Sequence, residues 1–378
     1  MMVKKRIAVR RVQAAGTVGP AHNSMVFTPD FCAGDRLPFA PALAARGPYA
    51  VGTRLLAAEG WPVGFELWYP AELRAGMEAR TRYTSDFAYS SAGEQVSLTF
   101  PGRAARGAPV RREGMPQAGW PLILFVQEAC GTSAWSHAAE HLASYGFVIA
   151  SVRPAQGIDA AAAARLCYKR VTTMANEEKC FLYAAVDGPN LGILAHENAC
   201  GEAVRALGGS ARALAFSSPV ALDRMTDGGT PLFVLLGDAQ PGAQEQRAQF
   251  EALCSERWLL VIENAGANAL QNPPCAQLAA ADMADAYHSR VEYAWDAARL
   301  NAMTDHFLTA FFRRFLAHDT AMERYLIGLK ERPDGMRDAD GNAWEGFTAE
   351  NRAVVRGEEC VCCENITMGL QLYHRGGR

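Results

Sequence analysis

Short apolar runs alternate with amphipathic segments along the chain, and this alternation constrains the fold more than any other feature. Runs of strand length that end in turn-forming residues lie at 120–131, 147–157, 212–222, 230–242 and 257–270, and 190–208 holds a strand followed by a helix. Helical periodicity occupies 133–146, 242–254 and 300–319. Because parallel neighbours need a crossover connection, usually a helix, the alternation predicts an α/β fold with a mostly parallel, doubly wound sheet.

The turns after these strands are the expected place for a site. The carboxyl ends of parallel strands meet at one edge of a sheet, and ligands bind in the crevice outside that edge. The segments that come together there are 127–131, 153–157, 195–199, 237–241 and 264–268.

Composition excludes several partner classes. The chain has 378 residues and a formal net charge of −3, so it has no basic surplus for nucleic acid. No apolar run approaches the roughly 18 residues of a membrane span. The basic start has no apolar segment after it, so no export signal is predicted and a cytoplasmic location is expected. We expect a small-molecule substrate and no cofactor, and the sequence leaves a homodimer open.

Ten cysteines are scattered along the chain, and only Cys360, Cys362 and Cys363 are clustered. This cluster has no second Cys pair and no nearby His pair, so the sequence argues against a zinc site there. In a reducing compartment most of the cysteines would be small buried apolar side chains.

The turn at residues 195–199 reads "AHENA" and lies between an apolar strand and a helix. A strand, a tight turn of small residues and a helix are typical of the nucleophile turn of α/β-hydrolases, which reads G-x-S-x-G. Glu197 occupies the position of the serine. The sequence therefore predicts a carboxylate in a turn that usually presents a hydroxyl.

Several segments together resemble one branch of the α/β-hydrolase superfamily, the bacterial dienelactone-hydrolase and platelet-activating-factor-acetylhydrolase-like proteins. They are "FELWYPAEL", "PLILFVQEACG", "LGILAHENACG", "PLFVLLGDAQPG" and "LVIENAGAN". The resemblance covers residues 48–320 and implies an α/β-hydrolase core that cuts esters or lactones with a Ser-His-Asp triad. Residues 1–47 are then an N-terminal arm, and 321–378 are a C-terminal extension packed on or near the core.

Position by position, the chain departs from the triad that the resemblance implies. Glu197 replaces the nucleophile, Gln240 the acid and Ala267, next to Asn268, the histidine, while Gln127 to Gly131 replace the glycine-rich oxyanion loop. Acyl transfer by serine needs an activated nucleophile with its base within hydrogen-bond reach. The sequence therefore argues against ordinary serine-esterase chemistry.

Glu197 and Glu128 are the predicted catalytic residues. The helix that starts near Asn198 offers free N–H groups and a partial positive charge, which favour a carboxylate at the turn. Two carboxylates in one concave site push their pKa values apart, as paired acid/base work requires. Arg153, at the next strand end, would keep one of them ionised or bind an anionic substrate.

The other residues that we expect around this site bind substrate or support the carboxylates: Gln127, Cys130, Arg153, His196, Asn198, Gln240, Asn268 and Trp135. Trp135 and Tyr168 would wall an apolar pocket.

Other interpretations of these residues remain open. In one alternative, Glu128 and Arg153 form a structural ion pair and Glu197 is a helix cap. In a second alternative, Cys200 is a thiol nucleophile, and in a third it pairs with Cys130 in a disulfide. In a fourth, Glu128, Glu197 and His196 form a metal site.

Three functions follow from the sequence. The first is an enzyme of altered chemistry in which Glu197, with Glu128, acts by acid/base or covalent catalysis on a small carbonyl-containing substrate, as a hydrolase, lyase, isomerase or cyclase. The second is an inactive member of the family that binds a ligand or a partner. The third is a conventional ester or lactone hydrolase whose triad lies elsewhere.

Overall fold

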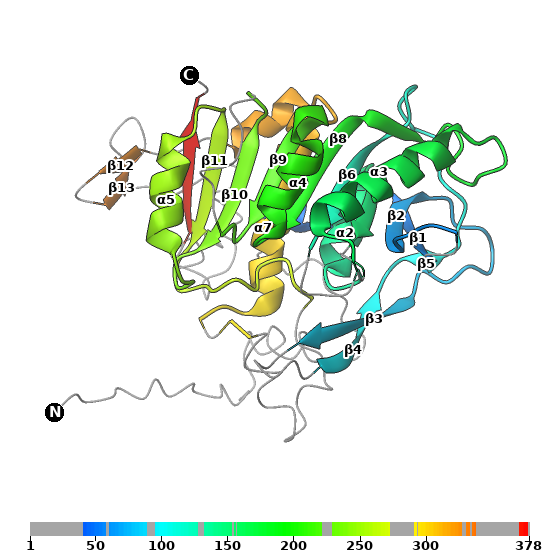
Figure 1. Ribbon diagram of the computed structural model, residues 1–378, viewed down its shortest axis with the longest axis horizontal. Coiled ribbons are helices and arrows are strands. Elements are labelled where there is room, and N and C mark those ends of the chain that lie inside the picture. The colour runs from blue at the N-terminus through cyan, green and yellow to red at the C-terminus, as the bar shows by residue number, and fades with distance from the viewer. Residues whose placement is uncertain are drawn as a thin grey trace.

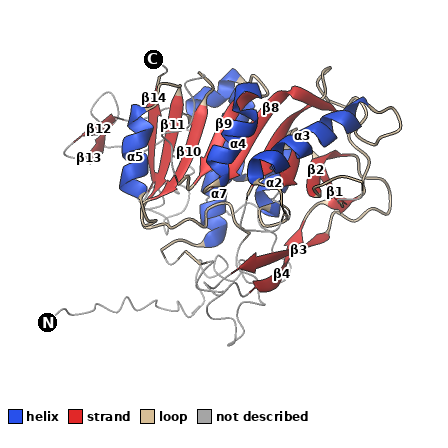
Figure 2. Cartoon of the chain, viewed as in Figure 1, coloured by secondary structure: helices blue, strands red, loops and turns tan. Residues whose placement is uncertain are grey.

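The computed structural model describes residues 41–57, 60–88, 95–127, 132–152, 155, 157–220, 229–272, 291–292, 294–326, 330–332, 335–337 and 370–376. This part of the chain forms one large mixed sheet with helices on both faces (Figures 1 and 2). The α/β class predicted from the alternating pattern is confirmed.

The sheet has ten strands in the order β14-β11-β10-β9-β8-β6-β7-β2-β1-β5. Strands β7, β6, β8, β9, β10 and β11 run parallel, whereas β2 is antiparallel to β7 and β14 to β11. The strands are β1 Ala50–Leu56, β2 Phe65–Ala71, β5 Ala105–Arg106, β6 Trp120–Val126, β7 Val148–Val152, β8 Val186–His196, β9 Ala211–Ser217, β10 Leu232–Gly237, β11 Arg257–Ile262 and β14 Leu370–Arg375.

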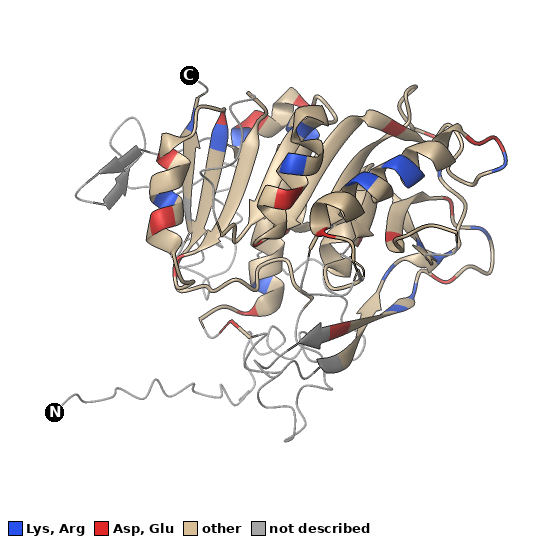
Figure 3. Ribbon diagram, viewed as in Figure 1, with Lys and Arg blue, Asp and Glu red and all other residues tan. Residues whose placement is uncertain are grey.

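Two helical layers bury the two faces of the sheet. The helices are α2 Ser136–Ser144, α3 Ala160–Asn176, α4 Ala199–Leu207, α5 Ala243–Ala252 and α7 Ala297–Phe315. Helices α3, α4 and α5 cover one face, and α2 and α7 cover the other. Buried parallel strands carry apolar residues on both faces, which explains the continuous apolar runs of the sequence. Charged side chains lie on the outer surfaces of α3, α4 and α5 (Figure 3).

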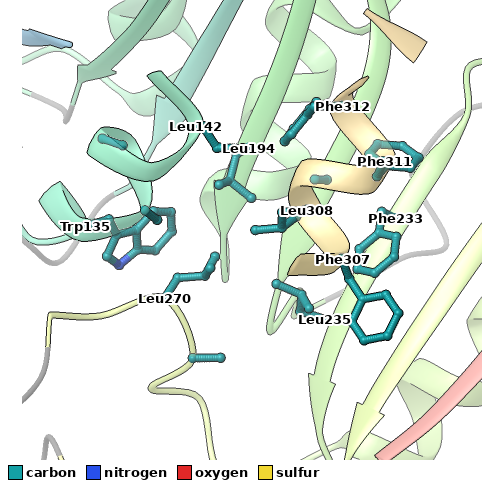
Figure 4. Close-up of a cluster of buried hydrophobic side chains, with 14 of the residues drawn as sticks. Trp135, Leu142, Leu194, Phe233, Leu235, Leu270, Phe307, Leu308, Phe311 and Phe312 are labelled. Carbon is teal, nitrogen blue, oxygen red and sulfur yellow. The ribbon is translucent and has the colours of Figure 1, made fainter. Parts of the chain in front are cut away.

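Helix α7 is the main support of its face. Its N-cap Asp296 accepts a hydrogen bond from the backbone of Arg299 at 3.1 Å, which fixes where the helix begins. Phe307 and Phe311 then pack on Phe233 of β10, with ring centroids 6.5 and 5.4 Å apart (Figure 4). None of the described helices combines the length and the apolar composition that a membrane span needs.

Residues 71–118 are polar with Gly and Arg, which predicts a long surface excursion, but part of this segment packs on the core. They contain a hairpin of β3 Thr81–Ala88 and β4 Gln95–Gly102 that packs on α2. Tyr83 donates to Glu140 of α2 at 2.7 Å and accepts from the Trp68 indole at 2.9 Å. The apolar signal of β3 is weak because two of its alternating buried residues, Thr81 and Ser85, are polar.

Strand β2 also differs from the expectation for residues 63–70. The alternating sequence "VGFELWYP" predicts an edge strand or hairpin there, but β2 lies inside the sheet between β7 and β1. Its residues are all buried, including Glu66. The charged residue gives the run an alternating appearance although neither face of β2 is exposed.

The ends of the described chain pack on the core. Residues Ala42–Ala44, within the predicted arm, form a 3₁₀ turn, and the Leu43 N–H donates to His306 of α7 at 3.1 Å. Within the predicted C-terminal extension, β14 extends the sheet beside β11. A short ribbon of β12 Lys330–Arg332 and β13 Gly335–Arg337 forms a separate sheet.

Candidate functional site

Glu197 lies in the turn between β8 and α4, at the carboxyl edge of the parallel strands. Its φ is +50°, a left-handed backbone that costs a residue with a Cβ about 1–2 kcal/mol. Hydrogen bonds hold the turn on both sides, from the Glu197 N–H to Ser217 O at 3.1 Å and from the Cys200 N–H to Glu197 O at 3.2 Å. The strained turn presents a side chain that is 45% exposed.

His196, the last residue of β8, lies between Glu197 and a tryptophan. Its ring meets the Trp135 ring edge to face, with centroids 5.2 Å apart. Its Nδ1 is 3.0 Å from the carbonyl oxygen of Ser217, and because a carbonyl only accepts, this nitrogen carries the hydrogen. Nε2 is then left facing Glu197 Oε1 at 3.6 Å.

Burial lowers the pKa of His196, while the Glu197 carboxylate and the bond to Ser217 act in the opposite direction. His196 is therefore neutral at pH 7, with the Nε2 lone pair toward the carboxylate. A proton delivered to Nε2 would create an imidazolium in contact with Glu197, so the two residues can hold and exchange a proton.

Two hydrogen-bonding groups beside His196 have no partner among the described residues. They are the Trp135 Nε1–H and the Ser217 hydroxyl, and both are buried. Buried polar groups are nearly always hydrogen-bonded, so each orphan needs an explanation. Sequence reasoning singled out Trp135 but missed Ser217, whose only signal was a polar residue at the end of a strand.

Gln240, at the position of the acid, and Asn268, next to the position of the histidine, bond to residues a few positions further along the chain. Gln240 donates to Gln246 of α5 at 2.6 Å, and the Asn268 side chain accepts from Gln271 at 3.0 Å. Glu292, which sequence reasoning missed, accepts from the backbone N–H groups of Gly266 at 2.6 Å and Asn268 at 3.0 Å. These bonds shape the two loops.

Asp238, the nearest acid to the expected position, is also engaged. It accepts the Asn264 N–H at 2.5 Å and so ties the turn after β10 to the turn after β11.

Three further predicted residues are less central. Gln127 is buried and donates to Ser151 of β7 at 3.2 Å, along the sheet. Asn198 is exposed and its side chain makes no cap for α4. The Tyr168 hydroxyl lies 3.4 Å from Gly188 O, near the opposite end of β8, so Tyr168 does not wall the site at Glu197.

Cys200 forms no disulfide, which contradicts a bridge to Cys130. It is fully buried in the first turn of α4, against the apolar layer between the sheet and the helices. The burial of Cys200 therefore also argues against its being a solvent-accessible thiol nucleophile.

Glu128, Cys130 and Arg153 lie outside the described residues, as does the cluster of Cys360, Cys362 and Cys363. The pairing of Glu197 with Glu128 thus stays a prediction. Among the residues that are described, no three His, Cys, Asp or Glu side chains are placed to hold a metal ion.

Glu66 is a second buried carboxyl near the same edge of the sheet. It accepts a hydrogen bond from the Ser133 hydroxyl at 2.5 Å, and burial is the main cause that raises its pKa. Strand β2 is three strands from β8, which places it roughly 14 Å away at the usual strand spacing. Glu66 is therefore too far from Glu197 to share a reacting atom, and it holds the segment that leads to Trp135.

The comparisons with known proteins assign no family. No protein-family model matches the chain, and no curated protein sequence matches it.

Proposed function

We propose that this protein is an enzyme of the α/β-hydrolase type with altered chemistry, in which Glu197 is the catalytic carboxylate. The substrate class is a small carbonyl-containing molecule such as an ester or a lactone. One observation carries the proposal: Glu197 has a left-handed backbone in the turn between β8 and α4. Strain of this kind concentrates at functional sites, because folding alone would favour glycine there.

The surroundings of Glu197 support acid/base work. The carboxylate is partly exposed, so a substrate can reach it, and neutral His196 lies behind it as a proton acceptor. As a general base, Glu197 would take a proton from water or from a carbon next to the carbonyl.

A covalent route uses the same residue. A Glu197 oxygen would attack the ester carbonyl carbon, the carbon–oxygen bond to the alcohol would break, and the alkoxide would leave with a proton from a neighbouring acid. Water would then hydrolyse the mixed anhydride and regenerate the carboxylate. Glu128 is the proposed partner in either route.

The test is the turnover of an ester and lactone panel by E197Q. We expect a loss of at least about 100-fold, since removal of a general base usually costs this much. The matched control is E202Q, because Glu202 is a partly exposed acid on α4 that pairs with Arg205. Full activity in folded E197Q would rule out the proposal.

A binding protein without activity is the second candidate. Gln240, at the position of the acid, and Asn268, next to that of the histidine, bond to nearby residues of the chain and favour this alternative. It predicts no turnover by the wild type on the panel and unchanged ligand binding by E197Q. A conventional hydrolase with its triad elsewhere would instead be labelled by a serine-directed organophosphonate, and an unlabelled folded sample would exclude it.

A further inference from the structure

A cavity of about 660 Å³ lies at the opposite edge of the sheet from Glu197. It is lined by the first residues of β6, by the start of β8 and by the segments after α2 and α7. Asp187, near the start of β8, lies in the wall, whereas Glu197 follows the end of that strand. At about 3.3 Å per residue the two positions are roughly 30 Å apart, so this cavity is separate from the proposed catalytic site.

Aromatic side chains form much of the wall. Tyr49 and Trp120 meet edge to face with centroids 5.0 Å apart, and Tyr145 lies in the wall with them. Gly146 has a φ of +100°, and a Cβ there would come within 2.9 Å of the Trp120 ring. The backbone thus approaches the indole closely, and glycine is required for this wall to form.

Asp187 is a carboxylate in this wall with no ion pair and no side-chain hydrogen bond to any described residue. Arg313 and Asp319, which also lie in the wall, form an ion pair with each other at 2.5 Å. Asp319 also accepts the Ala321 N–H at 3.1 Å. Besides His318, the charged side chains of the described wall are Asp187, Arg313 and Asp319, so one carboxylate there has no compensating cation.

Two helices end at the cavity and add to this negative potential. Helix α2 is capped by Tyr145 and α7 by Leu316, and both residues line the wall. The C-terminus of a helix carries a partial negative charge and stabilises cations. Asn190 donates to Leu316 O at 2.8 Å, which leaves its own Oδ1 free to accept.

The Tyr145 and Tyr49 rings of the wall already lie close to cations of this chain. The guanidinium carbon of Arg313 lies 5.6 Å from the centre of the Tyr145 ring, and that of Arg111 lies 5.5 Å from the Tyr49 ring. The face of an aromatic ring attracts cations. A carboxylate, two helix C-termini and aromatic walls all select for the same sign of charge.

We propose that this cavity is a binding site for an organic cation, an amine or quaternary ammonium compound with an apolar or aromatic body. Asp187 and Asn190 Oδ1 receive the ammonium group, and the body packs on Tyr49, Trp120 and Tyr145. The volume lies within the roughly 300–1,000 Å³ of small-molecule sites.

The experiment is calorimetric titration of the full chain with two probes of one skeleton, 3-phenylpropylamine and 3-phenylpropionate. They share the aromatic body and differ in the sign of charge at pH 7. We expect the amine to bind at least tenfold more tightly. D187N should weaken amine binding at least fivefold, and A317W, which fills the cavity from an exposed wall position, should abolish it.

Matched controls separate this site from surface charge and from the proposed catalytic site. E178Q removes one exposed acid outside the cavity wall and should leave amine binding unchanged. R314Q breaks a surface pair to Glu323 next to the cavity residue Arg313 and should also leave it unchanged. E197Q should bind the amine as the wild type does.

Circular dichroism checks that each variant is folded. The proposal is overturned if the amine does not bind at millimolar concentration, if the carboxylate binds equally well, or if folded D187N keeps the wild-type affinity.

Discussion

At the scale of single residues, the turn at Glu197 carries backbone strain. A glutamate with φ of +50° is strained where a glycine would not be. The neighbouring His196 and Ser217 hold the turn, and they do so with backbone and ring contacts that need no charge on Glu197. The residue at position 197 is therefore replaceable as far as the fold is concerned.

Replacing Glu197 by glycine should stabilise the protein by about 1 kcal/mol while it abolishes activity, because glycine relieves the left-handed strain. The free energy of unfolding in urea measures the gain. The matched control is E202G, which puts glycine inside α4 and should cost about 1 kcal/mol. A loss of stability in E197G would show that the carboxylate itself holds the turn.

His196 offers a direct measure of the charge on its neighbour. The Glu197 carboxylate is one of the causes that raise the His196 pKa against the effect of burial. In E197Q this pKa should fall below its wild-type value, and an NMR titration of the His196 Cε1–H signal follows it. An unchanged pKa would mean that Glu197 is protonated or turned away in solution.

At the scale of elements, Glu140 joins three parts of the chain to α2. Its carboxylate is buried and accepts bonds from the Tyr83 hydroxyl, from the Arg103 and Ala104 N–H groups and from Arg46. It therefore connects β3, the segment after β4 and the segment before β1 to α2, the helix that follows β6.

E140A should cost about 3 kcal/mol or more in the free energy of unfolding, since it leaves several buried donors without an acceptor. Hydrogen exchange should show lost protection in β3 and β4 before the sheet is affected. The control is E113A, whose side chain is 86% exposed and pairs with Arg111 at the surface, and which should change stability by less than about 0.5 kcal/mol. Equal effects of the two variants would contradict the assigned role of Glu140.

The sequence predicted the elements whose signals are local. The runs that became β6, β8 and β10 are mostly apolar, and the helical periodicity at 300–319 coincides with most of α7. The position of Glu197 followed from the same strand–turn–helix pattern. What could not be predicted rests on contacts between distant segments, such as Glu292 beneath the 264–268 loop or Tyr83 on Glu140. Such residues are ordinary polar residues until the fold brings their partners together.

At the scale of the whole molecule, the face between α2 and α7 contains buried ionisable groups. Asp305 is buried 4.0 Å from His141, and no described residue hydrogen-bonds to its carboxyl oxygens. Burial raises the Asp305 pKa to about 8 and lowers the pKa of His141 to about 3 and of His137 to about 4. His306 and Arg46 are the other groups in this region. Burial thus favours the neutral forms of Asp305, His141 and His137.

This arrangement predicts how stability depends on pH. The folded pKa of Asp305 lies above its unfolded value of 3.8, so the stability it contributes is full below that pH and is lost as the pH rises through about 8. The histidines have the opposite shift, so their contribution is lost as the pH falls below 6.5. Between these effects the protein should be most stable near pH 6.5, and it should lose about 1 kcal/mol per pH unit from there to pH 8.

D305N isolates the effect of Asp305, because an asparagine is neutral at every pH and has nearly the same shape. The free energy of unfolding, measured in urea from pH 6 to pH 9, should fall in the wild type and stay flat in the variant. D319N is the control, since Asp319 is a partly exposed acid beyond the C-terminal end of α7. Its loss should leave the slope of stability against pH unchanged. A wild-type slope in D305N would place the titrating group elsewhere in the molecule and show that Asp305 is ionised within the core.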